Sequence, residues 1–127
     1  MPSTQLSAYQ AVQTTTADPA RVMLELFDAA ARFLGQARRS LERGDLAAYT
    51  RLQSRAVAII AELSDCLDHK AGGEIARNLA RLYTFMLLHL TEGLIDKSPD
   101  HLRRVLEVLL TIRDGFERAV EQVRESA

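Results

Sequence analysis

Residues 98–120 read SPDHLRRVLEVLLTIRDGFERAV, and this stretch indicates a long amphipathic helix. Ser98 is suited to cap a helix, Pro99 to its first turn, and Asp100 to the positive end of its dipole. Apolar residues then recur every three or four positions, which is the spacing of one helical face. This stripe comprises Leu102, Val105, Leu106, Leu109, Ile112, Phe116, Val120 and Val123. The sequence therefore predicts a helix that begins at residues 98–99 and buries one side.

Three upstream segments show the same helical period, and we predict helices over residues 19–43, 46–68 and 73–95. Gly44 and the run that ends at Gly73 separate them, since glycine commonly follows a helix C-terminus. The connections are short, so neighbouring helices must pack antiparallel.

Capping residues support these boundaries. Asp18 followed by Pro19 indicates the start of the first helix, and Asp45 can cap the second. Glu74 places an acidic side chain in the first turn of the third helix. Gly93 is expected to weaken the last turn of that helix by about 1 kcal/mol relative to alanine.

The predicted fold is therefore all-α: an antiparallel up-down four-helix bundle over residues 18–127, preceded by a short flexible tail over residues 1–17. The residues expected in the core of its third and fourth helices are Ile75, Leu79, Met86, Leu109 and Phe116.

Composition narrows the class of protein. The 127 residues are 47% hydrophobic and 26% charged, which is typical of one globular domain. A formal net charge of −1 argues against a nucleic-acid binder or an anionic-membrane binder. The sequence has no apolar run long enough to span a membrane, and no signal-peptide core follows Met1. We therefore expect a cytoplasmic protein without membrane insertion.

The sequence neighbours of the three histidines form no clear catalytic or metal-binding pattern. His69 follows Asp65 by four residues, which suits either a metal or acid–base pair or a solvated side chain beside a helix end. His89 precedes Glu92 by three residues, and His101 lies in a first turn, but neither has a second ligand within sequence reach. We expect all three to be structural or solvated, with no metal site.

No other residue carries a catalytic pattern. Cys66 is the single cysteine, so no intramolecular disulfide can form. We expect it to be a small buried hydrophobic residue rather than a catalytic thiol. Asp28 can cap, pair with an arginine, or be a surface residue. Phosphate-binding loops, dinucleotide turns, paired cysteines and the di-iron bundle signature are absent from the sequence. We therefore predict neither catalytic residues nor cofactor, and no enzyme.

An apolar surplus remains outside the predicted stripes. Scattered surface residues or a wide stripe would explain it, because single exposed apolar residues are common. The functional alternative is a groove on the outside of the third and fourth helices that accepts an amphipathic partner helix. The residues concerned are Leu24, Phe85, Leu88, Val108 and Leu110.

The tail also carries apolar residues at helical spacing. Leu6, Tyr9 and Val12 are three apart, so the tail can either dock reversibly on its own domain or remain disordered. A docked tail would cover an apolar groove until a partner displaces it. We therefore add Tyr9 and Val12 to the candidate binding residues.

Short motifs recur in order along nearly the whole chain. They are AYQAV at 8–12, DP at 18–19, VMLELFDAA at 22–30, GGEIARNL at 72–79, LY at 82–83, FM at 85–86 and RDGF at 113–116. Together these stretches resemble the flagellar secretion chaperone FliS family. The departures are Ala29 where the family usually has glycine, Leu88-His89 where it often has two basic residues, and Phe116 where tryptophan is frequent.

The resemblance implies an antiparallel four-helix bundle that binds the C-terminal segment of flagellin. It further implies that binding prevents premature polymerisation and supports delivery to the export gate of the flagellar type III apparatus. In such proteins the N-terminal segment can cover part of the binding surface. The alternative is a regulatory or self-associating helical bundle without a flagellin client. We expect a monomer or a weak homodimer.

Overall fold

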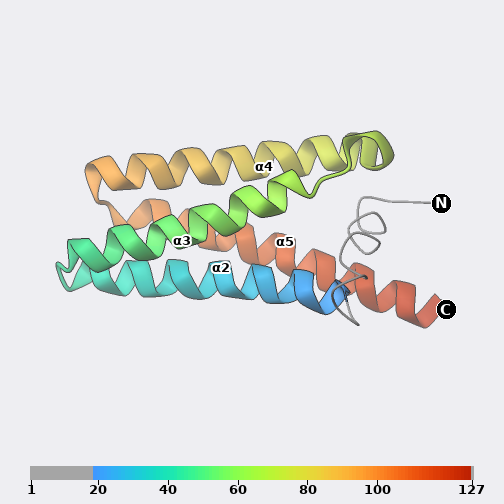
Figure 1. Ribbon diagram of the computed structural model, residues 1–127, viewed down its shortest axis with the longest axis horizontal. Coiled ribbons are helices and arrows are strands. Elements are labelled where there is room, and N and C mark those ends of the chain that lie inside the picture. The colour runs from blue at the N-terminus through green and yellow to red at the C-terminus, as the bar shows by residue number, and fades with distance from the viewer. Residues whose placement is uncertain (1–18, 127) are drawn as a thin grey trace.

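The computed structural model describes residues 19–126 and shows four helices with no strand in this range. Figure 1 shows α2 (Pro19–Glu42), α3 (Leu46–Asp65), α4 (His69–Asp96) and α5 (Pro99–Ser126). The predicted all-α class is confirmed.

The helices form an up-down bundle in which each helix packs against its two ring neighbours. The backbone of α2 runs close to α3 and α5, and that of α4 close to the same two helices, whereas the backbones of the diagonal pairs stay apart within residues 19–126. The chain reverses direction at each connection, and the last turns of α5 extend past the start of α2 (Figure 1). α2 packs more extensively than α4, whose contacts with α3 and α5 are sparser.

The core lies between all four helices and is almost entirely apolar. Its buried polar groups include Ser40 of α2 and Tyr49 and Gln53 of α3, and the last two donate hydrogen bonds to α4. The buried apolar cluster comprises Phe27, Ala30, Leu34, Ala37, Tyr49, Ala56, Ile60, Leu63, Tyr83, Met86, Leu90, Leu102, Val105 and Leu109.

The predicted boundary between the first two helices is confirmed. Gly44 has φ 79°, a left-handed conformation that favours glycine, and Asp45 caps α3. The Asp45 side chain accepts a hydrogen bond from the Ala48 N–H at 3.1 Å.

The start of α4 differs from the prediction. α3 ends at Asp65, and Asp68 then caps a helical turn by accepting hydrogen bonds from the N–H groups of Lys70 and Ala71. The break occurs inside α4, at Gly73, whose φ of 55° and ψ of −127° are open mainly to glycine. Capping by Asp68 thus adds a turn before the glycine pair.

The turn between α4 and α5 follows the Ser-Pro-Asp signal. Lys97 takes the left-handed conformation (φ 55°) that ends α4. The Ser98 hydroxyl accepts a hydrogen bond from the Asp100 N–H at 3.3 Å, as expected of a cap. α5 therefore begins at Pro99, as predicted.

Gly93 is buried, and its carbonyl joins α4 to α3. The Tyr49 hydroxyl donates a hydrogen bond of 2.7 Å to this oxygen. A Cβ at position 93 would lie 3.2 Å from that hydroxyl and 3.4 Å from the Cβ of His101 on α5. The Gln53 amide donates to the carbonyl of Leu90, one turn earlier. Glycine at position 93 thus allows α3, α4 and α5 to approach one another closely, although it lowers the helix propensity of α4.

The core prediction was right for Met86 and Leu109, which are fully buried, and wrong for Ile75. Leu79 and Phe116 are half-buried against the core. Ile75 is 72% exposed because the buried line of α4 begins at Ala76. A shift of one residue rotates a side chain by about 100° around a helix, which turns Ile75 away from the core.

Truncating Met86 and truncating Ile75 should give opposite results. Met86→Ala should lower the free energy of unfolding by about 2–5 kcal/mol, because it opens a cavity in the core. Ile75→Ala should change it by less than about 0.5 kcal/mol, as is usual for an exposed side chain. Urea unfolding followed by circular dichroism measures both. Equal losses would contradict the packing of α4 described here.

Removing the Tyr49 hydroxyl should also destabilise the bundle. Burial, and after it the nearby Asp96 carboxylate, raises the pKa of Tyr49, so the phenol remains a hydrogen-bond donor at neutral pH. Tyr49→Phe should lower the free energy of unfolding by about 0.5–1.5 kcal/mol.

The control for this change is Tyr83→Phe. The Tyr83 ring is also buried, but no hydrogen bond links its hydroxyl to another residue in the range 19–126. Its substitution should be nearly neutral in the same urea experiment. A larger loss for Tyr83→Phe than for Tyr49→Phe would show that the hydrogen bond to Gly93 contributes little.

Candidate functional site

The apolar surplus predicted from sequence is concentrated on α4. Most of the exposed large apolar side chains in the described residues belong to this helix, and Leu88 is 60% exposed. Those on α4 are Ile75, Leu82, Phe85, Leu88, Leu94 and Ile95. The helix that packs least against its neighbours therefore also carries the most uncovered apolar surface.

The exposed side chains of Leu82, Phe85, Leu88 and Ile95 share one face of α4, which we call the α4 outer stripe. Leu82, Phe85 and Leu88 follow at intervals of three residues, and Ile95 comes seven residues after Leu88. Residues three apart are neighbours on a helix surface, whereas Ile95 lies two turns beyond Leu88 on the same face. Phe85 and Leu88, both predicted from sequence, therefore lie side by side.

Two other predicted residues lie on a different side of the bundle, where α2 meets α5. Asp28 of α2 and Arg113 of α5 form an ion pair there at 3.0 Å. Leu24 precedes Asp28 by one helical turn, and Leu110 precedes Arg113 by three residues. Leu24 is half-buried and Leu110 is exposed.

The remaining predicted binding residues are Val108, Tyr9 and Val12, and none of them belongs to the α4 outer stripe. Val108 is half-buried and packs against the core, as the wide-stripe alternative predicts. Tyr9 and Val12 lie outside the described residues. The structure thus brings together Phe85 and Leu88, and places Leu24 and Leu110 at the α2–α5 seam.

The Arg113 side chain on α5 forms ion pairs with three carboxylates, one of which is on α2. Its guanidinium donates to Asp28 on α2, and to Asp114 and Glu117 on its own helix, at 3.0, 3.3 and 2.9 Å. These partners, Asp28 first, raise the pKa of Arg113. Asp28 thus pairs with an arginine and is also a surface residue, so two of the alternatives considered for it are confirmed.

Cys66 departs from its prediction. It is exposed rather than buried, because α3 ends just before it, at Asp65. Partial desolvation, followed by the charges of Glu62 and Asp65, raises the pKa of its thiol. A protonated thiol is a poor nucleophile, so the setting does not favour catalysis.

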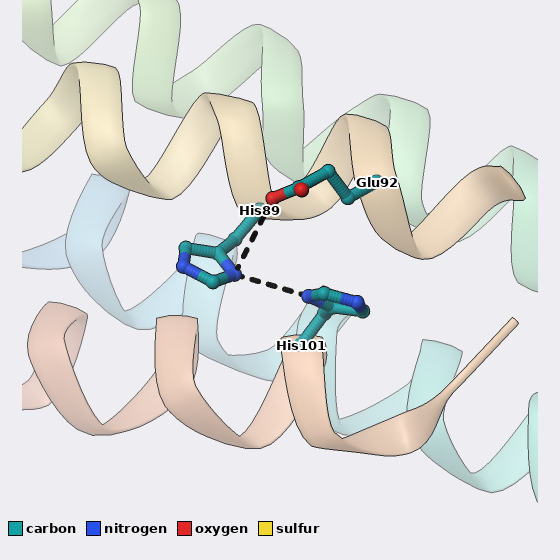
Figure 2. Close-up of side chains that lie close together, drawn as sticks. All are labelled: His89, Glu92 and His101. Atoms are coloured by element: carbon teal, nitrogen blue, oxygen red, sulfur yellow. Dashed lines mark hydrogen bonds and ion pairs between the residues drawn. The ribbon is translucent and has the colours of Figure 1, made fainter. Parts of the chain in front are cut away.

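Two of the histidines belong to a cluster of side chains that their spacing in the sequence did not reveal. Nδ1 of His89 on α4 lies 3.0 Å from Nδ1 of His101 on α5 (Figure 2). Oε1 of Glu92 lies 3.8 Å from the same nitrogen of His89. The expectation that neither histidine has a second ligand within reach was therefore wrong, because it considered only neighbours in sequence. His69, in contrast, is exposed at the start of α4.

Asp96 and Phe85 hold this cluster in place. His101 Nε2 lies 2.8 Å from Oδ2 of Asp96, a distance at which the imidazole N–H donates to the carboxylate. That hydrogen bond, and after it the Ser98 N–H, lowers the pKa of Asp96. The Phe85 ring meets His89 edge-on, with a centroid distance of 4.3 Å. The cluster therefore borders the α4 outer stripe.

One sequence signal could have pointed to the cluster. The Ser-Pro-Asp start fixes His101 in the first turn of α5, close to the connection with α4. The side of α4 that it meets depends on the close approach at Gly93, which sequence spacing does not give.

No helix in the described part of the chain is both long enough and apolar enough to cross a membrane.

Comparison with known proteins places the chain in a family. The family model described as "Flagellar protein FliS" matches residues 2–123. The chain is 34% identical over 115 residues to flagellar secretion chaperone FliS of Salmonella typhimurium, covering 90% of this chain and 84% of that protein. It is 33% identical over 105 residues to flagellar secretion chaperone FliSB of Pseudomonas aeruginosa, covering 83% of each.

A third relative is more distant but spans a similar range. Flagellar secretion chaperone FliS of Vibrio cholerae is 29% identical over 117 residues, covering 89% of this chain and 86% of that protein. The similarity therefore extends over nearly all of the bundle, and includes both the α4 outer stripe and the α2–α5 seam. The chain belongs to the FliS family of flagellar proteins.

Proposed function

We propose that this protein is a cytoplasmic export chaperone that binds the C-terminal segment of flagellin. Binding prevents premature polymerisation and supports delivery of the subunit to the flagellar type III export apparatus. The relatives' name, flagellar secretion chaperone, supports the general role. The α4 outer stripe is the observation that carries the proposed contact, because it is uncovered apolar surface on a helix face.

The chemistry of the stripe suits an amphipathic client. An apolar ridge along one helix accepts the apolar face of another helix, with anchors that recur every three or four residues. Phe85 offers a partly exposed aromatic ring, and Leu88 an aliphatic side chain that is 60% exposed. Exposed polar residues lie on the same face as these anchors: Glu92 comes between Leu88 and Ile95, and Arg81 one turn before Phe85.

Competition explains how binding would prevent polymerisation. We propose that the flagellin segment packs into the filament through the same apolar faces that it presents to the chaperone. A segment that is unfolded before binding must lose conformational entropy on ordering. An extended interface, burying on the order of 2,000 Å², offsets that loss. The α2–α5 seam with Leu24 and Leu110 would extend the contact beyond α4.

The N-terminal tail is proposed as an internal competitor. Its residues Tyr9 and Val12 would occupy part of the apolar surface in the free protein and leave when the client arrives. This action is exchange of one apolar segment for another and needs no catalytic residue, consistent with a protein that works by binding.

The decisive experiment is calorimetric titration with a flagellin C-terminal peptide of roughly 40–50 residues, long enough for coupled folding. We expect 1:1 binding with a negative heat-capacity change, which is the signature of apolar burial. Leu88→Glu should weaken binding by about tenfold to a hundredfold, because it removes an apolar anchor and adds a charge. Its thermal melt, followed by circular dichroism, should be nearly unchanged, since Leu88 is exposed.

Leu46→Glu is the matched control. Leu46 is also an exposed leucine, but it lies in the first turn of α3, where a carboxylate is tolerated. This variant should bind the peptide as the parent does. Equal weakening by both substitutions, or none by Leu88→Glu, would place the contact away from the α4 outer stripe.

Self-association is the alternative from another class, in which the exposed apolar residues form a homodimer seam. Light scattering at several concentrations separates the two. A client-binding chaperone should keep a monomer mass, or a weak monomer–dimer equilibrium, and remain able to bind the peptide. A stable dimer that Leu88→Glu dissociates, together with no peptide binding, would favour the regulatory bundle.

A further inference from the structure

We propose that His89, Glu92 and His101 bind a Zn²⁺ ion between α4 and α5. The three side chains come from two helices, and their ligand atoms all lie within 4.8 Å of one another (Figure 2). This inference is independent of the flagellin contact, because it rests on the donor atoms alone.

The distances suit a small ion after slight adjustment. Zinc binds imidazole nitrogen and carboxylate oxygen at about 2.0–2.2 Å, so tetrahedral ligand atoms lie roughly 3.3 Å apart. The two Nδ1 atoms are 3.0 Å apart, and Oε1 of Glu92 is 3.8 Å from Nδ1 of His89. The Glu92 side chain is 60% exposed and free to close this gap, whereas the histidine side chains are only 19% and 18% exposed.

Asp96 gives His101 the orientation that a metal ligand needs. The imidazole of a metal-binding histidine usually donates its second N–H to a carboxylate, which fixes the tautomer. His101 Nε2 lies 2.8 Å from Oδ2 of Asp96, so its Nε2–H is directed at the carboxylate. The lone pair of its Nδ1 then points at His89.

His89 is positioned from the other side. Because the Nε2–H of His101 is directed at Asp96, we assign the Nδ1–H of His89 as the donor to Nδ1 of His101 in the ion-free protein. When Zn²⁺ binds at Nδ1 of His89, the proton moves through solvent from Nδ1 to Nε2 of the same ring, so the two imidazoles stay neutral. Phe85 packs edge-on against His89 and limits rotation of the ring. The hydrogen bond to Asp96 holds the ring of His101.

The set of donors selects the class of ion. Two imidazoles with one carboxylate are typical of zinc, whereas calcium and magnesium prefer oxygen ligands. Three protein ligands leave a fourth position, which the exposure of Glu92 opens to water or to a side chain of a bound partner. Since the ligands come from both helices, the ion would hold α4 and α5 together beside the α4 outer stripe.

The test uses the full chain without a histidine tag, freed of metal by a chelator and titrated with ZnCl₂ in a calorimeter. We expect saturable 1:1 binding and a rise in Tm of roughly 5–15 °C at about a hundredfold excess over Kd. Co²⁺ should give visible absorption bands of a tetrahedral site. His89→Ala and His101→Ala should abolish both signals.

Two further variants test the proposal even if a histidine substitution unfolds the bundle. Glu92→Gln changes an exposed side chain and should weaken Zn²⁺ binding by about tenfold with an unchanged melt of the metal-free protein. Asp96→Asn should weaken it by about 10–100-fold through the orientation of His101.

His69→Ala and Cys66→Ser are the controls, because both residues are exposed potential ligands outside the cluster. Both variants should bind Zn²⁺ as the parent does. Absence of saturable binding would overturn the proposal, as would binding that Glu92→Gln leaves intact and Cys66→Ser or His69→Ala removes.

Discussion

The close approach of three helices at Gly93 is the constraint on which the rest of this end of the bundle depends. The Tyr49 hydroxyl reaches the Gly93 carbonyl at 2.7 Å, and the Cβ of His101 lies against the same glycine. A Cβ at position 93 would lie 3.2 Å from that hydroxyl, which would have to shift by a few tenths of an ångström. The missing Cβ therefore contributes to the register of α4 against α3. Gln53 repeats the contact one turn away, at the Leu90 carbonyl, so the register is held at two points.

This constraint also explains the unequal surfaces of α4. The helix turns a line of residues that includes Ala76, Tyr83, Met86 and Leu90 toward the core, with little contact on its flanks. The α4 outer stripe is left over on the opposite side. A helix that is apolar on most of its circumference is usually covered on both sides, which is why a partner segment fits the observations. The α2–α5 seam, in contrast, carries the ion pairs of Arg113.

Much of the fold could be predicted because its signals are local. Asp45 caps α3 and Pro99 begins α5 as expected, since a cap and a fixed φ act within one turn of chain. The flagellar family was also accessible from short motifs, and the comparisons confirm it. The errors at Ile75 and Cys66 arise where one residue of helical phase, or the end of a helix, decides burial.

The sequence by itself determined four amphipathic helices, their order, their antiparallel packing and the family, because each follows from periodicity, capping or motif. Only the tertiary structure decided which apolar residues share a surface, and that His89 meets His101 across two helices. The physical reason is that such contacts depend on the rotation and axial position of one helix against another. These are fixed by side-chain packing and by the contact at Gly93, to which residues distant in sequence contribute together.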